Sequence, residues 1–181
     1  HSDIVGGSIV IKENKEYAEK ISFIQNAVGA VPSPFDCYLL TRSIKTLSVR
    51  MKQHNENAIA VSNYLSNHPK IEKVFFPGND KRHKEIAEKQ MDGFGGMMSF
   101  VIDSDINGVK TFLKNLNLFT LAESLGGVES LIEHPAIMTH ASIDPSIREK
   151  LGISETLLRI SVGIEDVDDL ISDLDQALSK I

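Results

Sequence analysis

A single, mostly apolar stripe constrains the fold more than any other feature of the sequence. Its members follow one another at alternating steps of four and three residues, which places all of them on one face of an α-helix. They are Leu40, Ile44, Leu47, Met51, His54, Ala58, Val61 and Leu65. The spacing predicts one helix of about thirty residues that ends at His68-Pro69, and such a long helix is typical of a bridge between two layers or subunits. We therefore expect a domain boundary near its middle, around residue 48.

The segments on either side of this helix predict alternating strands and helices. Before it, the β-branched run 4–11 indicates a buried strand, and 17–28 has helical spacing that breaks at Gly29. The strands expected after it span 74–76, 97–102 and 158–162. The helices expected after it span 84–90, 109–116 and 167–178. Strands and helices interleaved in this way favour an α/β domain in which helices cover a small sheet.

Composition narrows the classes of partner. The net charge of −6 and the pI of about 5.5 leave no basic surface for nucleic acid or an anionic membrane. Cys37 is the only cysteine, so an intrachain disulfide is impossible and a reducing, cytoplasmic location is expected. No apolar run approaches the roughly 18 to 20 residues of a membrane-spanning helix, and the first residues do not resemble a signal peptide. The histidines show none of the usual metal-ligand spacings, so no metal site is expected.

Two features carry possible binding chemistry. Arg159 lies in an alternating segment in which Leu158, Ile160 and Val162 take the core side. Its own side chain therefore faces either solvent or a cleft, and a guanidinium on a rigid strand is suited to bidentate capture of a carboxylate. The adjacent glycines of 126–127 form either a simple turn or a place where a small ligand approaches the backbone closely.

A long, ordered series of segments resembles the cystathionine γ-lyase and γ-synthase family of pyridoxal-phosphate (PLP) enzymes. The segments span 1–7, 34–39, 45–47, 50–51, 57–58, 119–127, 129–131, 134–136, 138–142 and 158–166. They cover nearly the whole chain and include the strings Ala122-Glu123-Ser124-Leu125-Gly126-Gly127 and Leu158-Arg159-Ile160-Ser161-Val162-Gly163. Such a series is far more specific than any one motif.

The resemblance implies an α/β, aspartate-aminotransferase-like fold for PLP-dependent transferases. Residues 1–48 are then the end of the large, PLP-binding domain, and residues 49–181 are the C-terminal small domain. The lysine that forms the Schiff base with PLP is expected just upstream of His1, in keeping with a truncated or processed chain, and the other cofactor-binding groups are also expected outside it. The chain alone is therefore expected to be inactive and without PLP, whereas the full-length enzyme is expected to be a homotetramer.

The resemblance also assigns roles to three residues. Arg159 matches the arginine that grips the α-carboxylate of the amino-acid substrate. Ser124 matches a serine that hydrogen-bonds near the catalytic lysine and that carboxylate, and it is the catalytic candidate. Glu123 matches a position that faces the distal amino group of cystathionine-type substrates. PLP serves such enzymes as an electron sink for loss of the sulfur substituent from Cγ.

Three functions remain open at this point. The first is a trans-sulfuration lyase, with cystathionine γ-lyase favoured, and the second is cystathionine γ-synthase. The third is a stand-alone, non-catalytic module retained for folding and subunit contacts. An unrelated α/β binding domain survives only if the family resemblance is a coincidence.

Overall fold

The computed structural model describes all residues, 1–181, and divides them into two compact units, His1–Leu47 and Ser48–Ile181. The first unit contains α1 (Lys15–Val28), α2 (Pro34–Ser43) and the 3-10 turn η1 (Ile44–Thr46). The α1 helix begins where the Asn14 side chain accepts a hydrogen bond from the Tyr17 amide, and it ends at Gly29, whose φ of 72° favours glycine.

The strand expected at residues 4–11 is absent, so that prediction was wrong. The segment has no regular structure, and Val5 and Val10 are 98% and 91% exposed. A β-strand exists only where a neighbouring strand pairs with its backbone, and no strand of this chain pairs with the segment. Local β-propensity was therefore not sufficient to form it.

The predicted long helix is present in two pieces. It consists of α2 and α3 (Leu47–Ser66), which the tighter η1 turn separates. The stripe divides in the same region: Leu40, Ile44 and Met51 are exposed, whereas His54 and the members that follow it are buried. The first unit contains no buried residue, so its apolar side chains form no core of their own.

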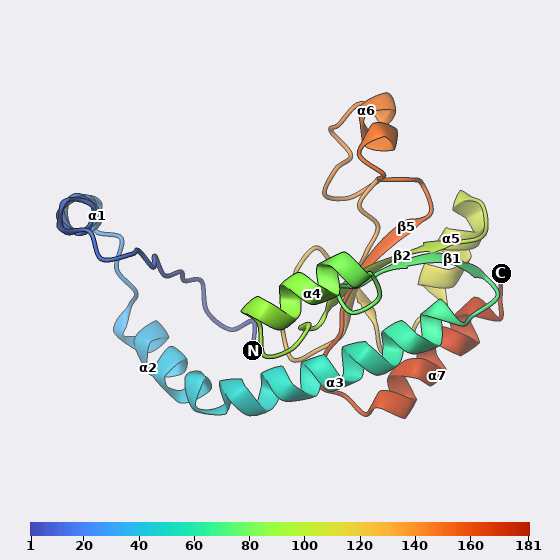
Figure 1. Ribbon diagram of the computed structural model, residues 1–181, viewed down its shortest axis with the longest axis horizontal. Helices are drawn as coiled ribbons and strands as arrows, with labels where there is room; N and C mark the ends of the chain where they lie inside the picture. Colours follow the sequence, from blue (N-terminus) through green and yellow to red (C-terminus); the bar gives the residue numbers. More distant parts are fainter. The chain divides into compact units, whose positions relative to one another are not determined.

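The second unit is a five-stranded mixed sheet with helices (Figure 1). Its order is β1-β2-β5-β4-β3, and only the β3–β4 pair is parallel. The strands are β1 (Ile71–Phe75), β2 (Met97–Ile102), β3 (Thr120–Leu121), β4 (Leu131–Glu133) and β5 (Leu157–Ser161). The helices of this unit besides α3 are α4 (Lys81–Gln90), α5 (Ile106–Lys114), α6 (Pro145–Lys150) and α7 (Val167–Leu178). The expected α/β class is confirmed.

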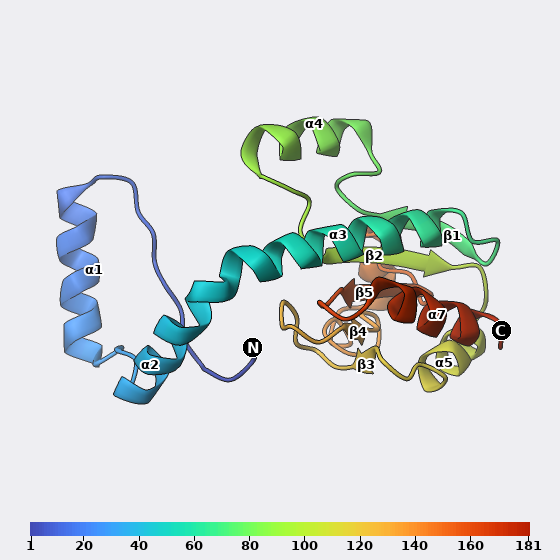
Figure 2. The ribbon, with the colours of Figure 1, turned by 90° about the horizontal axis from the view of Figure 1, so that it is seen from below.

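One face of the sheet carries the core. Alternate residues of β2 and β5, such as Phe100 and Ile160, are fully buried against α3, α5 and α7 (Figure 2). The segment that contains α6 lies on the opposite side of the sheet from α3 and α7 (Figure 1). Loops therefore cover the second face of the sheet. The strand residues between the core positions point to this face, and Arg159 is one of them.

A buried carboxylate on α7 fixes the approach to β3. Asp173 is 5% exposed; one of its oxygens accepts the Asn117 amide at 2.8 Å, and the other accepts the amides of Leu118 at 2.8 Å and Phe119 at 3.1 Å. Burial by itself raises the pKa of this carboxyl, but the amide hydrogen bonds favour the charged form and hold its pKa below the ordinary value. Asp173 thereby anchors the chain immediately before Thr120.

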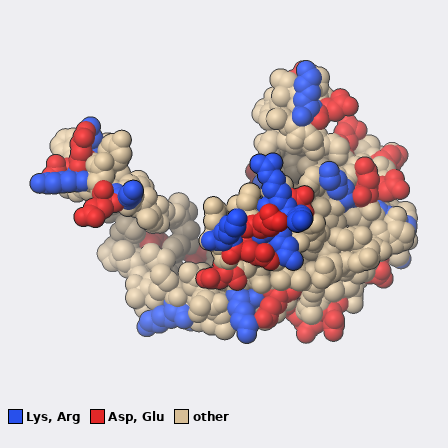
Figure 3. Space-filling view, in the orientation of Figure 1, with Lys and Arg blue, Asp and Glu red and all other residues tan.

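The surface carries charges of both signs. Over α4, lysines, arginines and acidic residues are interspersed on the face that Figure 3 shows. No helix combines the length and the apolar character that crossing a bilayer requires.

Candidate functional site

Arg159 lies at the centre of β5, between two positions that face the core. Leu158 and Ile160 are fully buried on the core face, as the alternation predicted. The neighbours of Arg159 on its own face, Leu157 and Ser161, are also buried, at 8% and 4% exposure. The Arg159 side chain is 31% exposed, so its head reaches solvent from a surface that is otherwise covered. Arg159 is thus partly covered, and it remains accessible to solvent.

A buried glutamate pairs with this arginine. Glu133 is the register partner of Arg159 across the antiparallel β4–β5 pair, so the two side chains leave the sheet on the same face. Arg159 Nη2 lies 2.9 Å from Glu133 Oε2, and the Glu133 side chain is only 3% exposed. Oε2 has no aligned hydrogen-bond donor, so the contact is an ion pair. The Glu133 carboxylate thus lies beneath a partly exposed guanidinium.

The loop between β3 and β4 is fastened to the same face. The Gly126 amide donates to Ser161 Oγ at 2.8 Å, and Ser161 is two residues from Arg159 on the same side of β5. Gly126 has a φ of 77°, which other residues rarely adopt. The glycine therefore serves a turn that brings a backbone amide to the sheet, beside the arginine's strand.

The far end of this loop is held by a second carboxylate. Glu165 accepts the Ser130 amide at 2.7 Å on one oxygen and the Ser130 hydroxyl at 2.9 Å on the other. Ser130 Oγ in turn accepts the Gly163 amide at 2.8 Å, and the Ile164 amide donates to Val128 O at 2.9 Å. We call this set, Val128 and Ser130 with Gly163, Ile164 and Glu165, the loop clamp. It ties the loop to the chain that leaves β5.

Gly163 is required by the tightness of the clamp. A Cβ atom at this position would lie 2.2 Å from Glu165 Oε2, 2.4 Å from Val128 O and 2.7 Å from Ser130 N. Asn57 of α3, which is 1% exposed, supports the same place from the core side by donating to the carbonyls of Gly163 at 3.0 Å and Glu165 at 2.8 Å. The loop clamp is thus attached to helix α3 through Asn57.

The other two residues expected in the site lie on the fastened loop. Ser124 and Glu123 are exposed, two and three residues before Gly126. Neither side chain is hydrogen-bonded to Arg159, so the structure brings them onto a loop fixed beside β5 without joining them to the guanidinium. The cross-strand partners of Arg159 are Glu133 on β4 and Ser99 on β2, and Ser161, which accepts from the Gly126 amide, is two residues away on the same strand.

Sequence reasoning missed these supporting residues for a physical reason. Glu133 is close to Arg159 only because of the β4–β5 register, which joins residues far apart in the sequence. Glu165 lies next to Asp166, which caps α7, but its carboxylate accepts from Ser130, which is 35 residues earlier in the sequence. One available signal was the Gly163 that follows the alternating strand, because such a glycine often marks a close backbone approach.

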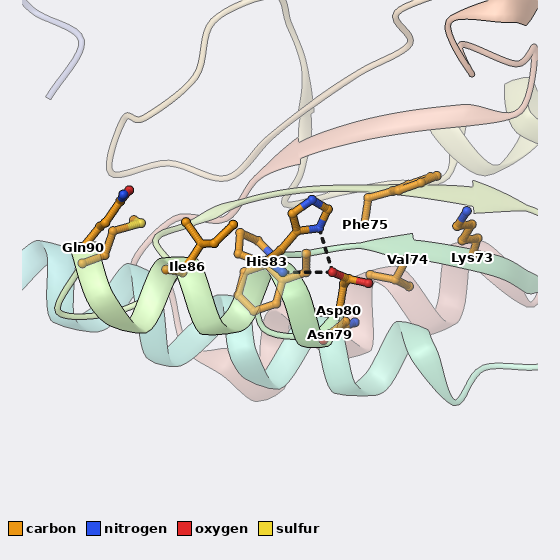
Figure 4. A pocket seen from close by; sticks show the side chains of 12 residues that line it. Lys73, Val74, Phe75, Asn79, Asp80, His83, Ile86 and Gln90 are labelled. Atoms are coloured by element: carbon orange, nitrogen blue, oxygen red, sulfur yellow. Dashed lines mark hydrogen bonds and ion pairs between the residues drawn. The ribbon is translucent and has the colours of Figure 1, made fainter.

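A separate hollow lies between β1 and α4 (Figure 4). It is lined largely by apolar groups, among them Phe75 and Ile86. Its polar pair, His83 Nδ1 and Asp80 Oδ1 at 3.1 Å, is exposed, and Asp80 also caps the start of α4. The polar groups of this hollow thus stabilise a helix end. None of the residues that the sequence assigns to the site lies in it.

The site is poor in groups that bind metals or PLP. No group of three or more His, Cys, Asp or Glu residues is placed to hold a metal ion. The segments that build the site, 119–133 and 159–165, contain no lysine, and their single arginine is paired with Glu133. The loop amides already donate within the chain, so the group that the site offers to the carboxylate of a small ligand is the Arg159 guanidinium. These segments contain no lysine amine that could form a Schiff base with PLP.

Comparison with known proteins assigns the chain to a family. It is 54% identical over 182 residues to cystathionine gamma-lyase of Dictyostelium discoideum, an alignment that covers 99% of this chain and 46% of that protein. It is 52% identical over 180 residues to cystathionine beta-lyase of Coxiella burnetii, covering 98% and 46%. The chain thus spans about half the length of these curated relatives.

A solved structure extends the likeness to the fold. The cystathionine gamma synthase of Xanthomonas oryzae pv. oryzae, crystallised in complex with cystathionine, superposes with a TM-score of 0.87 at 43% identity, over 94% of this chain and 44% of that one. The fold is therefore the α/β fold of these PLP-dependent enzymes, as expected. The profile of the Cys/Met metabolism PLP-dependent enzyme family matches residues 1–179. The chain belongs to the Cys/Met metabolism PLP-dependent enzyme family.

Proposed function

We propose that this chain supplies the substrate-carboxylate side of the active site in a longer, PLP-dependent enzyme that acts on cystathionine. Relatives at 52–54% identity are named cystathionine gamma-lyase and cystathionine beta-lyase, and the similar solved structure is a cystathionine gamma synthase. Of these activities we favour the γ-lyase, because a γ-lyase has the higher identity of the two relatives described.

The single observation that carries the proposal is the setting of Arg159. Its guanidinium is held on a rigid strand by one nitrogen, Nη2, and its partial exposure leaves other N–H groups available to a ligand. A guanidinium binds a carboxylate through two parallel hydrogen bonds, which fix orientation as well as position. Arg159 is thereby suited to orient the Cα–H bond of a bound amino acid for proton removal.

Ser124 and Glu123 complete the substrate side of this proposal. Their loop is fixed at Gly126 to β5 and at Ser130 to Glu165, so its conformation does not depend on the ligand. Ser124 is exposed and its hydroxyl is free to turn toward the carboxylate that Arg159 holds, whereas Glu123 is suited to a distal ammonium group of cystathionine. We assign substrate orientation to Ser124 and choice among sulfur amino acids to Glu123.

The cofactor is assigned to the rest of the longer protein. The site segments 119–133 and 159–165 lack a lysine, so they contain no amine that could form the Schiff base with PLP. When bound, PLP supplies an electron sink for the carbanion formed at the substrate carbon. The residues of this chain hold the substrate, orient it and shield one side of it.

The uncovered first unit supports a longer protein. Residues 1–47 have no buried side chain, and exposed apolar groups such as Phe23, Phe35 and Leu40 form a large uncovered set. We infer that this unit is the end of a large PLP-binding domain whose remaining residues cover it, and that the full-length enzyme forms homotetramers in the cytoplasm. Size-exclusion chromatography with light scattering checks the assembly.

The assay that tests the proposal uses the full-length protein loaded with PLP. We expect L-cystathionine to give 2-oxobutyrate and cysteine, the γ-lyase products. Pyruvate and homocysteine identify a β-lyase instead, and synthesis of cystathionine from an activated homoserine plus cysteine identifies a γ-synthase. Failure of all three reactions in a protein that shows the 420 nm absorbance of bound PLP refutes the substrate class.

A further inference from the structure

We infer that Glu133 is a positioning residue for substrate binding, because it holds the guanidinium of Arg159 in the orientation that receives a carboxylate. This inference rests on the proposed function of Arg159 and adds a second residue to it. Glu133 does not itself touch the substrate. It acts through the arginine.

Burial and register carry the inference. Glu133 is 2% exposed overall and is the direct cross-strand partner of Arg159. A buried carboxylate is costly unless a cation compensates it, so Glu133 requires Arg159. Arg159 is partly exposed, so water can solvate its guanidinium without a buried partner. The position of the glutamate therefore fixes the arginine, which otherwise has several rotatable bonds.

The details of the contact leave the arginine free to bind. Only Nη2 meets Glu133, at 2.9 Å from Oε2, and Oε2 has no aligned hydrogen-bond donor. The other carboxylate oxygen, Oε1, accepts the Thr139 hydroxyl at 3.4 Å, which ties the pair to the loop after β4. The guanidinium has five N–H donors, so holding one nitrogen leaves enough for a second carboxylate. The negative charge of Glu133 lies beneath the guanidinium, on its buried side.

The test is Glu133→Gln in the full-length, PLP-loaded protein, with two ligands that differ only in the carboxylate. L-Homoserine carries the α-carboxylate, and 3-aminopropan-1-ol has the same amine and hydroxyl without it. We expect Glu133→Gln to weaken L-homoserine binding about tenfold, the order of one oriented charge-assisted interaction, and to leave binding of 3-aminopropan-1-ol within about twofold. KM for L-cystathionine rises by a similar factor while kcat changes less than about threefold.

Controls separate the possible outcomes. Glu155→Gln neutralises an exposed glutamate two residues before β5. This variant is expected to behave as wild type. Equal weakening of both ligands shows general damage and overturns the positioning role, as does unchanged or tighter homoserine binding. Arg159→Lys distinguishes this failure from failure of the proposed function. If Arg159→Lys binds homoserine as wild type does, the arginine is not the carboxylate site; if only that variant is impaired, Glu133 has no positioning role.

Discussion

Gly163→Ala tests whether the loop clamp holds the substrate loop. The added methyl group would lie 2.2–2.7 Å from three atoms, and two of them, Val128 O and Ser130 N, belong to the backbone. These distances are about 1 Å shorter than ordinary contacts of a Cβ, so the loop must move away from the strand end. Movement breaks the two hydrogen bonds from Ser130 to Glu165, at 2.7 and 2.9 Å.

The expected cost follows from these contacts. Hydrogen bonds to a charged group contribute about 1.5–3 kcal/mol each, and overpacking without breaking them costs about 1–3 kcal/mol. The chain either breaks the hydrogen bonds or tolerates the overpacking, whichever costs less free energy. We therefore expect a loss of about 3 kcal/mol in the free energy of unfolding. With a urea dependence of about 2 kcal/mol per molar, the midpoint falls by about 1.5 M.

Equilibrium urea unfolding followed by far-UV circular dichroism measures the shift. The matched control is Gly7→Ala, because a Cβ at Gly7 meets no atom within 4 Å and the residue has no positive φ. We expect the control midpoint to stay within about 0.3 M of wild type. If Gly163→Ala were equally mild, the loop would be free to shift, and the argument that it is fixed beside β5 would fail.

Two further substitutions test the supports of the site. Asp173→Asn turns an amide group toward backbone N–H donors such as that of Leu118, so we expect a loss of about 2–4 kcal/mol in unfolding free energy. The folded-state pKa of Asp173 is depressed, so its stabilisation is complete above its unfolded pKa of about 3.9 and is lost as pH falls through the folded value. The gap between wild type and Asp173→Asn in urea midpoint therefore narrows below about pH 4, and a constant gap contradicts the charge argument. Asn57→Ala removes the donor to two carbonyls and costs about 2 kcal/mol in the same assay, whereas a change under about 0.5 kcal/mol shows that water replaces the amide.

Local periodicity predicted the elements whose apolar face meets this chain's own core. The α7 helix and the β2 and β5 strands lie where their spacing placed them, because their buried residues pack on one another. The same reasoning was wrong for residues 4–11, where no strand pairs with the segment, and it overlooked the η1 turn that interrupts the long helix. The short β3 and β4 strands had no period long enough to detect.

The site was predictable only in part for a similar reason. Arg159 could be singled out because it is a charge within an alternating strand, and family resemblance added Ser124 and Glu123. Glu133 and Glu165 could not be found, because the first depends on strand register and the second on a contact with Ser130 that is remote in sequence. Non-local contacts of this kind leave no local pattern in the residues that make them.

A crystal structure of the full-length, PLP-loaded protein with bound L-cystathionine tests the central claim most directly. We predict that two N–H groups of Arg159 donate to the α-carboxylate of the ligand at about 2.7–2.9 Å while Nη2 remains beside Glu133. A carboxylate held by another cation, with the Arg159 guanidinium more than about 4 Å away, would contradict the account.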